Sequence, residues 1–500
     1  WRVLVPDFVS AGLQVAEGQT PRLDDIGTSM RRWAHALSEE ARSEDRVREI
    51  ELWQRVLDGP DPLLGSRPFD PRQDVVSTVR RLRATVDASV TDALLKGVPA
   101  AYHGGVNDGL LAALALAVAK WRAERGQSEP SVLIQLEGHG REENVVPGAD
   151  LSRTVGWFTT AFPVRLDIQG VDLADAFAGG RHAGAAVKAV KEQLLAVPDK
   201  GIGYGLLRYL NPETAEVFAG LPDGQISFNY LGQLLLGDID TDAGQLPWTP
   251  AGGTGDLELA ADDEMPANKL VDINAVVSDG SDGPQLGATF AFVSSVLDEA
   301  DVRRLADLWV QALEALASHV ASPAAGGLTP SDLPLVSLSQ SDIEVFEGRF
   351  PALSDVWPLA PLQSGLLFHA MLAEQSVDMY AIQTVLDLSG TVDTQKLHRA
   401  AEAVVERHPN LRTAFVSDSD GHPVQIVLND VIVPWTEVDL TGEPDAEDAW
   451  RRVLDEDQAM RFDMSAPPLL RFTFATVAPG RYRLLMASHH ILLDGWPMPL

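Results

Sequence analysis

The sequence of 500 residues contains no cysteine. This absence excludes a disulfide framework and a thiolate nucleophile, and nothing else in the composition argues for secretion. Basic side chains are also scarce, because 39 lysines and arginines stand against 72 aspartates and glutamates, which gives a formal net charge of -33. A surface of this charge repels nucleic acids and anionic membranes. We therefore expect a cytoplasmic protein with neither as a partner.

Long hydrophobic runs are missing as well. No apolar stretch approaches the roughly 18 residues of a membrane span, and no signal peptide opens the chain. The hydrophobic share of 45% and the charged share of 22% are ordinary for globular domains, and this length predicts two or three folding units. The chain begins at Trp1 without an initiator methionine, so we expect a window from a longer polypeptide.

Two adjacent histidines stand near the carboxyl end. Residues 481–487 predict a buried strand, and Asp494 with Gly495 predicts the turn that follows. Successive side chains of a strand point to opposite faces, so His489 and His490 cannot easily bind one ion, and we expect no metal site. A buried, hydrogen-bonded role is the simpler interpretation for His489, as is a turn cap for Asp494. For His490, a general base is chemically reasonable because imidazole titrates near working pH.

A second group of reactive side chains follows another predicted strand. Residues 131–136 are apolar enough to form a buried strand, which places Glu137 and His139 beside Gly138 and Gly140 at its end. A carboxylate and an imidazole at a strand end favour a catalytic interpretation. From the residues alone, a glycine turn with solvated charges explains the pattern more simply.

The remaining pattern mixes helices and strands. Residues 107–121 predict a helix capped by Asn107 or Asp108, and residues 298–320 predict an amphipathic helix that closes a first domain. Residues 321–350 form a linker by composition, and the recurrence of Leu328, Leu333 and Leu338 predicts that it packs on a domain surface. Further helices and strands follow in residues 351–500, so the fold class is α/β.

Three segments carry a resemblance to a known family. The motif His489-His490-x-x-x-Asp494-Gly495-Trp496, with residues 358–369 and 407–415 upstream, resembles the condensation domains of nonribosomal peptide synthetases. The resemblance implies a chloramphenicol-acetyltransferase-like fold of two lobes, with residues 351–500 as an amino-terminal lobe truncated after this motif. It also implies that His490 is catalytic, with His489, Asp494 and Gly495 in supporting roles.

Residues 1–320 resemble the carboxy-terminal part of a synthetase epimerisation domain. The resemblance rests on residues 137–142, 150–160, 203–209 and 228–233, and on Asn107-Asp108 after Val106. It implies that Glu137 is one acid-base group, and that the other is a histidine upstream of residue 1. Asn107 and Asp108 are supporting candidates. Asn229 and Tyr230 are candidates for holding an enolate or a pantetheine arm, and packing is an equal alternative for Tyr230.

Together the two resemblances imply part of a multimodular synthetase. They predict that a carrier-bound L-aminoacyl or peptidyl thioester is epimerised, and that a condensation domain of the D-donor, L-acceptor type then forms the peptide bond. No directly bound cofactor is expected, because substrates arrive on phosphopantetheine arms of carrier domains upstream and downstream in the same polypeptide. The alternatives are a non-catalytic carrier-docking scaffold and a stand-alone acyltransferase of the same fold.

Overall fold

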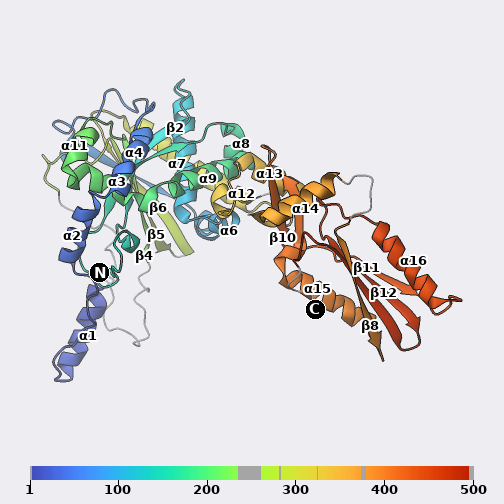
Figure 1. Cartoon of the computed structure of the whole chain (residues 1–500). Coiled ribbons are helices and arrows are strands. Elements are labelled where there is room, and N and C mark those ends of the chain that lie inside the picture. Colours follow the sequence, from blue (N-terminus) through green and yellow to red (C-terminus); the bar gives the residue numbers. More distant parts are fainter. Residues whose placement is uncertain (1–2, 235–260, 281–282, 324, 373–378, 495–500) are drawn as a thin grey trace. The chain divides into compact units, whose positions relative to one another are not determined.

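The computed structural model describes residues 3–234, 261–280, 283–323, 325–372 and 379–494. The chain divides into two units, Trp1–Gly326 and Gly327–Leu500, coloured blue to yellow and orange to red in Figure 1. The division lies within the segment predicted as a linker, and the assignment of a function to each unit stays a prediction. Within the described ranges, no helix combines the length and the apolarity needed to cross a bilayer.

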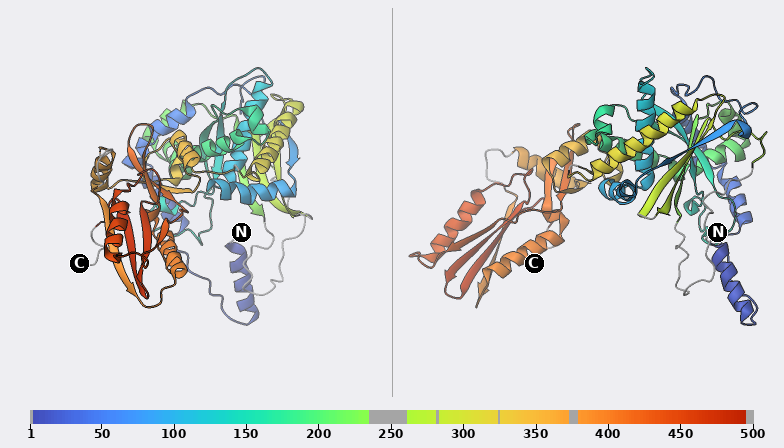
Figure 2. Two further views of the ribbon diagram at one scale, coloured as in Figure 1. Left: turned by 90° about the vertical axis from the view of Figure 1, so that its right-hand side faces the viewer. Right: turned by 180° about the vertical axis from the view of Figure 1, so that it is seen from behind.

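The first unit is built on one sheet of six strands (Figures 1 and 2). The strands are β1 (Val79–Thr85), β2 (Ser131–Gly138), β3 (Thr160–Asp167), β4 (Ile226–Leu234), β5 (Val271–Gly280) and β6 (Gly283–Val293), in the order β1-β6-β5-β4-β2-β3. β4 is parallel to both of its neighbours, β2 and β5, and the other pairs are antiparallel. The strand predicted at 131–136 is therefore β2, next to the sheet edge.

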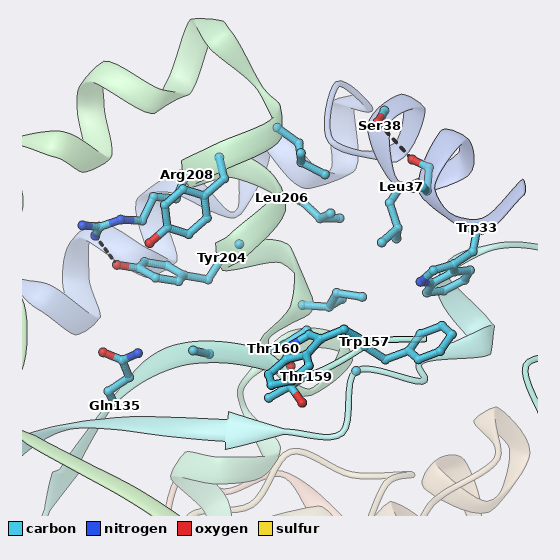
Figure 3. A pocket seen from close by; sticks show the side chains of 18 of the residues that line it. Trp33, Leu37, Ser38, Gln135, Trp157, Thr159, Thr160, Tyr204, Leu206 and Arg208 are labelled. Atoms are coloured by element: carbon cyan, nitrogen blue, oxygen red, sulfur yellow. Dashed lines mark hydrogen bonds between the residues drawn. The ribbon is translucent and has the colours of Figure 1, made fainter. Parts of the chain in front are cut away.

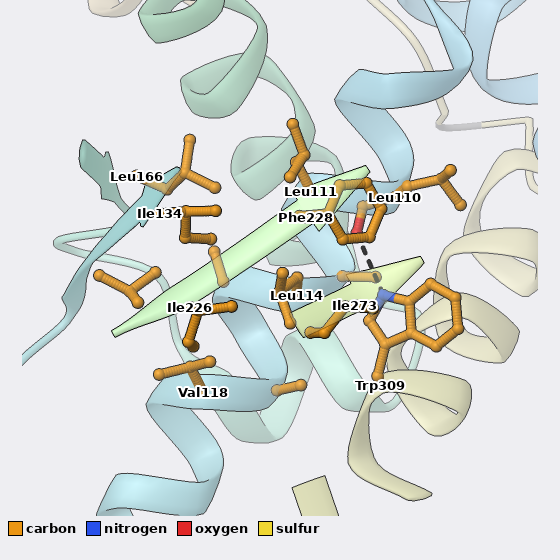
Figure 4. Packing of buried hydrophobic residues seen from close by; sticks show 14 of the residues in the cluster. Leu110, Leu111, Leu114, Val118, Ile134, Leu166, Ile226, Phe228, Ile273 and Trp309 are labelled. Atoms are coloured by element: carbon orange, nitrogen blue, oxygen red, sulfur yellow. Dashed lines mark hydrogen bonds between the residues drawn. The ribbon is translucent and has the colours of Figure 1, made fainter. Parts of the chain in front are cut away.

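Three helices cover the apolar face of this sheet: α7 (Val106–Ala123), α9 (Arg181–Leu195) and α12 (Glu299–Val320). α7 is apolar on all sides and is buried from Gly109 to Ala119. Figure 4 shows its leucines against Ile134, Phe228 and Ile273 of the sheet. The indole N–H of Trp309 on α12 donates to the Leu110 carbonyl at 3.2 Å, which links the two helices. Strand alternation then leaves the polar side chains of β2, β4 and β5 on the opposite face.

The predicted cap of α7 is wrong. The helix begins at Val106 and its N-cap is Gly105, not Asn107 or Asp108. Asp108 is the third residue of the helix, and its carboxylate accepts a bond from the Gly105 N–H at 2.7 Å. A carboxylate in this position caps the helix from inside its first turn. The sequence pattern does not distinguish such a residue from one at the N-cap position itself.

The first unit contains further short helices. They are α1 (Leu4–Ala16), α2 (Met30–Glu40), α3 (Glu44–Arg48), α4 (Ile50–Leu57), α5 (Ala88–Asp92), α6 (Val98–Tyr102), α8 (Leu173–Phe177), α10 (Ile202–Gly205) and α11 (Pro212–Ala219). Two π-helical turns, Ala93–Gly97 and Leu206–Leu210, continue α5 and α10.

The second unit has two sheets. The first is β7-β10-β9, from β7 (Leu353–Pro358), β9 (Thr413–Ser417) and β10 (Pro423–Leu428). The second is β11-β12-β13-β8, from β8 (Ala381–Ser389), β11 (Trp435–Asp439), β12 (Leu470–Ala478) and β13 (Arg481–His489). The helices are α13 (Gln340–Arg349), α14 (Pro361–Leu372), α15 (Thr394–Arg407) and α16 (Ala446–Ala459). The predicted strand before the two histidines is thus β13, an inner strand of its sheet.

The predicted linker is packed from Leu333 onward. Leu333 is only 1% exposed, and it lies with Leu338, Ile343 and Phe346 in a cluster that includes Val356 of β7. Residues with this burial belong to a core. The packing predicted from the recurring leucines is therefore confirmed, with Leu328 partly buried against the same cluster.

Candidate active sites

Glu137 stands at the end of β2, on the polar face of the first sheet. The register pairs Leu136 with Phe228, so Glu137 lies beside Asn229 on β4. The Asn229 side-chain amide donates to the Glu137 carboxylate at 2.8 Å. Desolvation by the surrounding protein raises the pKa of Glu137, and the Asp272 carboxylate raises it further. A carboxyl group with a raised pKa is a stronger base once it is ionised, which suits proton transfer near neutral pH.

Asp272 is held by a polar network on the same face. Its carboxylate accepts from the Ser227 hydroxyl at 2.5 Å, from the Asn274 amide at 3.0 Å and from the Asn268 amide at 3.2 Å. These donors fix the position of the Asp272 carboxylate, whose negative charge raises the pKa of Glu137. Asp272 was not among the residues predicted from the sequence. The alternation of Ser227 and Asn229 on β4, and of Asp272 and Asn274 on β5, with apolar residues was a visible signal.

The loop after Glu137 is pinned to the segment that precedes β3. The Arg141 guanidinium donates to the carbonyls of Leu151 and Thr154, at 2.5 and 2.9 Å, and lies 4.1 Å from the centroid of the Phe158 ring. His139 accepts a bond from the Arg141 N–H at 3.0 Å through its Nδ1 atom. The segments that contain residues 137–142 and 150–160 therefore form one structure around Glu137.

A substitution at Gly140 tests the contact between the loop after Glu137 and the segment that precedes β3. Its φ is +66°, and a Cβ added there would lie 1.7 Å from the Phe158 carbonyl oxygen. Gly148 has a φ of +74°, but a Cβ there would meet nothing within 4 Å. Both alanine variants carry a similar backbone strain of about 1 kcal/mol. We expect Gly140→Ala to lose several times more unfolding free energy than Gly148→Ala in thermal melts, and equal losses would contradict the contact.

In the second unit, His489 is the last residue of β13 and is fully buried. Its Nδ1 atom accepts a bond from the Ile491 N–H at 3.1 Å, so the neutral ring carries its proton on Nε2. The rings of Tyr380 and Phe462 lie 6.3 and 6.4 Å from it, centroid to centroid. The structure thus places His489 in the core, behind the following turn.

His490 follows in the turn and is half-buried. Its backbone N–H donates to the Tyr380 carbonyl at 2.8 Å. Its Nδ1 atom is buried and has no hydrogen-bond partner among the residues that the structure describes. A buried polar atom without a partner costs free energy, and such atoms in native proteins call for an explanation. Because this nitrogen is closed to solvent, any contact of His490 with a substrate has to use the other ring nitrogen, Nε2.

The turn after His490 is held by the two upstream motifs. The Gln363 side chain, on α14, donates to the Ile491 carbonyl at 2.9 Å. The Asn410 side chain, just before β9, donates to the Leu492 carbonyl at 3.2 Å. Three segments that lie far apart in the sequence, 358–369, 407–415 and 488–494, thus meet at one turn.

Comparison with known protein families gives a match in both units. A family model described as "Condensation domain" matches residues 1–333 and 353–500. The chain belongs to the condensation-domain family. A linear gramicidin synthase of Brevibacillus parabrevis is 36% identical over 506 residues, which cover 100% of this chain and 6% of that protein. Bacitracin synthase 1 of Bacillus licheniformis is 31% identical over 99% of this chain and 9% of its own length.

A solved structure supports the fold assignment. The crystal structure of the epimerization domain from the third module of tyrocidine synthetase B is 30% identical, with a TM-score of 0.52, over 64% of this chain and 66% of that chain. The predicted fold class, α/β of the chloramphenicol-acetyltransferase-like type, is confirmed. The chain spans less than a tenth of the length of the two synthases, so the activities of whole synthases enter only as proposals.

The remaining candidates of this condensation-family chain occupy different places. Asn107 is exposed in the first turn of α7, where Asp108 serves the cap. Tyr230 alternates with Asn229 along β4 and packs, half-buried, against the main core of the first unit. Asp494 is exposed beyond the β13 turn, and Gly495 lies outside the described residues. In the described ranges, no cluster of three or more histidine, aspartate or glutamate side chains is arranged to hold a metal ion.

Gln363 and Asn410 were not predicted as site residues from the sequence. We expect Gln363→Leu to slow peptide-bond formation about tenfold and to cost at least about 1–2 kcal/mol of unfolding free energy. The Ile491 carbonyl loses its donor, and the Ala360 N–H and the Gln425 amide lose their acceptor. Product formation and thermal melts measure the two effects. Gln395→Leu, at an exposed position of α15, is the matched control and should change neither. Unchanged product formation in Gln363→Leu would show that this contact does not position the turn.

Proposed function

We propose that this chain is part of a multimodular nonribosomal peptide synthetase in which the first unit epimerises a carrier-bound aminoacyl or peptidyl thioester. The observation that carries the proposal is the Glu137 carboxyl, which has a raised pKa and a bond from Asn229. Its unit is similar to a solved epimerization domain, which supports the same activity.

The proposed reaction exchanges one proton for another at the α-carbon. A base removes the α-proton, the electrons of the C–H bond pass into an enolate, and an acid on the other side returns a proton to the opposite face. Glu137 is one of these two groups, and by resemblance a histidine upstream of residue 1 is the other. The negative enolate oxygen requires hydrogen-bond donors, for which the Asn229 amide is a candidate on the same face.

The second unit is proposed to join the D-configured product to the next amino acid. The acceptor amine attacks the donor thioester carbonyl, a C–N bond forms, the C–S bond breaks, and the thiolate takes up a proton. His490 either accepts the proton of the attacking amine or orients the amine and stabilises the tetrahedral intermediate. The half-buried position of His490, in a turn that Gln363 and Asn410 hold, supports a role in this site.

The partners follow from the same proposal. The substrates are held as thioesters on phosphopantetheine arms of carrier domains, upstream and downstream in the same polypeptide, and no cofactor is bound directly. Residues 362–369 resemble the condensation type that takes D-donors and L-acceptors. A complete domain that couples L-donors equally well would refute this preference. The cytoplasmic location also stays a prediction.

The competing proposal is a carrier-docking scaffold without turnover. The polar network around Asp272 and Glu137 weighs against it, because a scaffold needs no carboxyl group with a raised pKa at the end of a strand. In a polypeptide extended to complete both domains and their carriers, His490→Ala should abolish the peptide product while carrier binding stays unchanged. Normal product from that variant would remove His490 from the mechanism.

A further inference from the structure

A pocket of about 620 Å³ opens in the first unit between α2, the π-helical turn Leu206–Leu210 and the polar face of β2 and β3 (Figure 3). This volume lies within the range of about 300–1,000 Å³ that is typical of ligand sites. The proposed chemistry assigns no role to it.

The pocket adjoins Glu137. Gln135 lines it and shares a strand face with Glu137, two residues or about 7 Å further along β2. Ala161 and Thr160 also line it, and the β2–β3 register pairs them with Glu137 and Gly138. A thioester whose α-carbon lies at the Glu137 carboxyl therefore has this pocket as its neighbour on the same sheet face.

One end of the pocket is apolar. Trp33 and Leu37 of α2 face Phe158, Ile202 and Leu206, which belong with Trp33 to a small separate core. The other end contains one ion pair and one guanidinium that is bonded to a neutral hydroxyl. Lys269 bonds to Asp223 at 2.5 Å, and Arg208 donates to the Tyr204 hydroxyl at 2.6 Å.

Two aromatic side chains at this pocket are open to solvent. Trp157 is 84% exposed and Tyr209 is 74% exposed. Large aromatic rings gain much free energy from burial, so exposed rings beside a cavity are characteristic of binding surfaces. Trp157 lies in the segment 150–160, which Arg141 ties to the Glu137 loop.

We propose that this pocket binds the amino-acid side chain of the thioester that Glu137 deprotonates, and that it selects uncharged apolar or aromatic side chains. The inference rests on the proposed epimerase function. An apolar chain buries surface against Leu37 and the exposed rings of Trp157 and Tyr209. An acidic chain approaches the carboxylates of Glu137 and Asp272, and Lys269 is already paired with Asp223.

The test measures α-proton exchange in deuterated water, with the upstream carrier loaded with L-phenylalanine, L-alanine or L-glutamate. We expect the parent protein to exchange the phenylalanyl thioester at least tenfold faster than the glutamyl thioester. Trp157→Ala should slow exchange of the phenylalanyl thioester about tenfold and that of the alanyl thioester less than twofold, while Trp157→Phe restores most of the rate. Leu195→Ala, at a 60% exposed position of α9 that does not line the pocket, should change none of these rates.

Two results would overturn the pocket assignment: equal slowing of the phenylalanyl and alanyl thioesters, or no slowing of either. A parent without any exchange contradicts the epimerase function instead. In that case, titration calorimetry with a soluble N-acetyl-phenylalanyl pantetheine thioester still tests the pocket. Binding that is lost in Trp157→Ala supports the assignment, and binding that is absent from the parent refutes it.

Discussion

Glu137→Gln is expected to lower α-proton exchange in a carrier-bound L-aminoacyl thioester by at least about 100-fold, the usual contribution of a general acid-base group. Glutamine keeps the size of the side chain and an oxygen for the Asn229 amide at this position, but it cannot take up a proton. Exchange is followed by mass spectrometry in deuterated water, in a polypeptide that completes the domain and supplies its carrier.

The stability of the same variant distinguishes catalysis from folding. The folded-state pKa of Glu137 is raised, so between its unfolded and folded pKa values the folded protein binds more protons than the unfolded chain. Its contribution to stability is present below the unfolded pKa and is lost as pH rises through the folded pKa. At neutral pH, Glu137→Gln should therefore melt at the same temperature as the parent or slightly above it. A melting temperature several degrees lower would indicate a structural role.

The same pKa direction predicts the pH profile of exchange. The carboxylate form of Glu137 is the base, so exchange should rise with pH through a midpoint above the ordinary glutamate value of about 4.3. Asp272→Asn removes the second cause of the raised pKa and should move this midpoint to lower pH. Asp301→Asn, a change of the same charge on α12, is the control and should leave the midpoint in place. A midpoint that does not move in Asp272→Asn would contradict the coupling of the two carboxylates.

His490→Ala is expected to reduce peptide-bond formation by at least about 100-fold while the donor is still epimerised. The two reactions use different units, so the loss should be confined to condensation. The D-configured thioester should then accumulate on its carrier, and chiral chromatography of the released amino acid measures it. His398→Ala, at a half-buried histidine stacked on Trp435 at 4.9 Å, is a matched control outside the turn. Equal losses in the two variants would point to packing as the cause.

The sequence predicted the elements that rest on local patterns. The helix α7 and the strands β2 and β13 agree with the structure, because apolar spacing decides them locally. The resemblance of the ordered motifs to synthetase condensation and epimerisation domains supplied the fold class and the two candidate catalytic residues, Glu137 and His490.

Contacts between distant segments could not be predicted in this way. Asp272 raises the pKa of Glu137 only because β5 and β2 flank the same strand, β4. A local sequence pattern does not determine the order of strands in a sheet. The bond from Gln363 to the Ile491 carbonyl spans 128 positions of sequence. The cap of α7 failed for a different reason, since Asp108 stabilises the helix from its third residue.

The most direct test of the proposed function is the stereochemistry of the dipeptide made by the extended polypeptide from two L-amino acids. We predict a D-L dipeptide from the parent, no exchange and no D-L product from Glu137→Gln, and D-thioester without dipeptide from His490→Ala. An L-L dipeptide from the parent, without α-proton exchange, would contradict both the epimerase function of the first unit and the donor preference of the second.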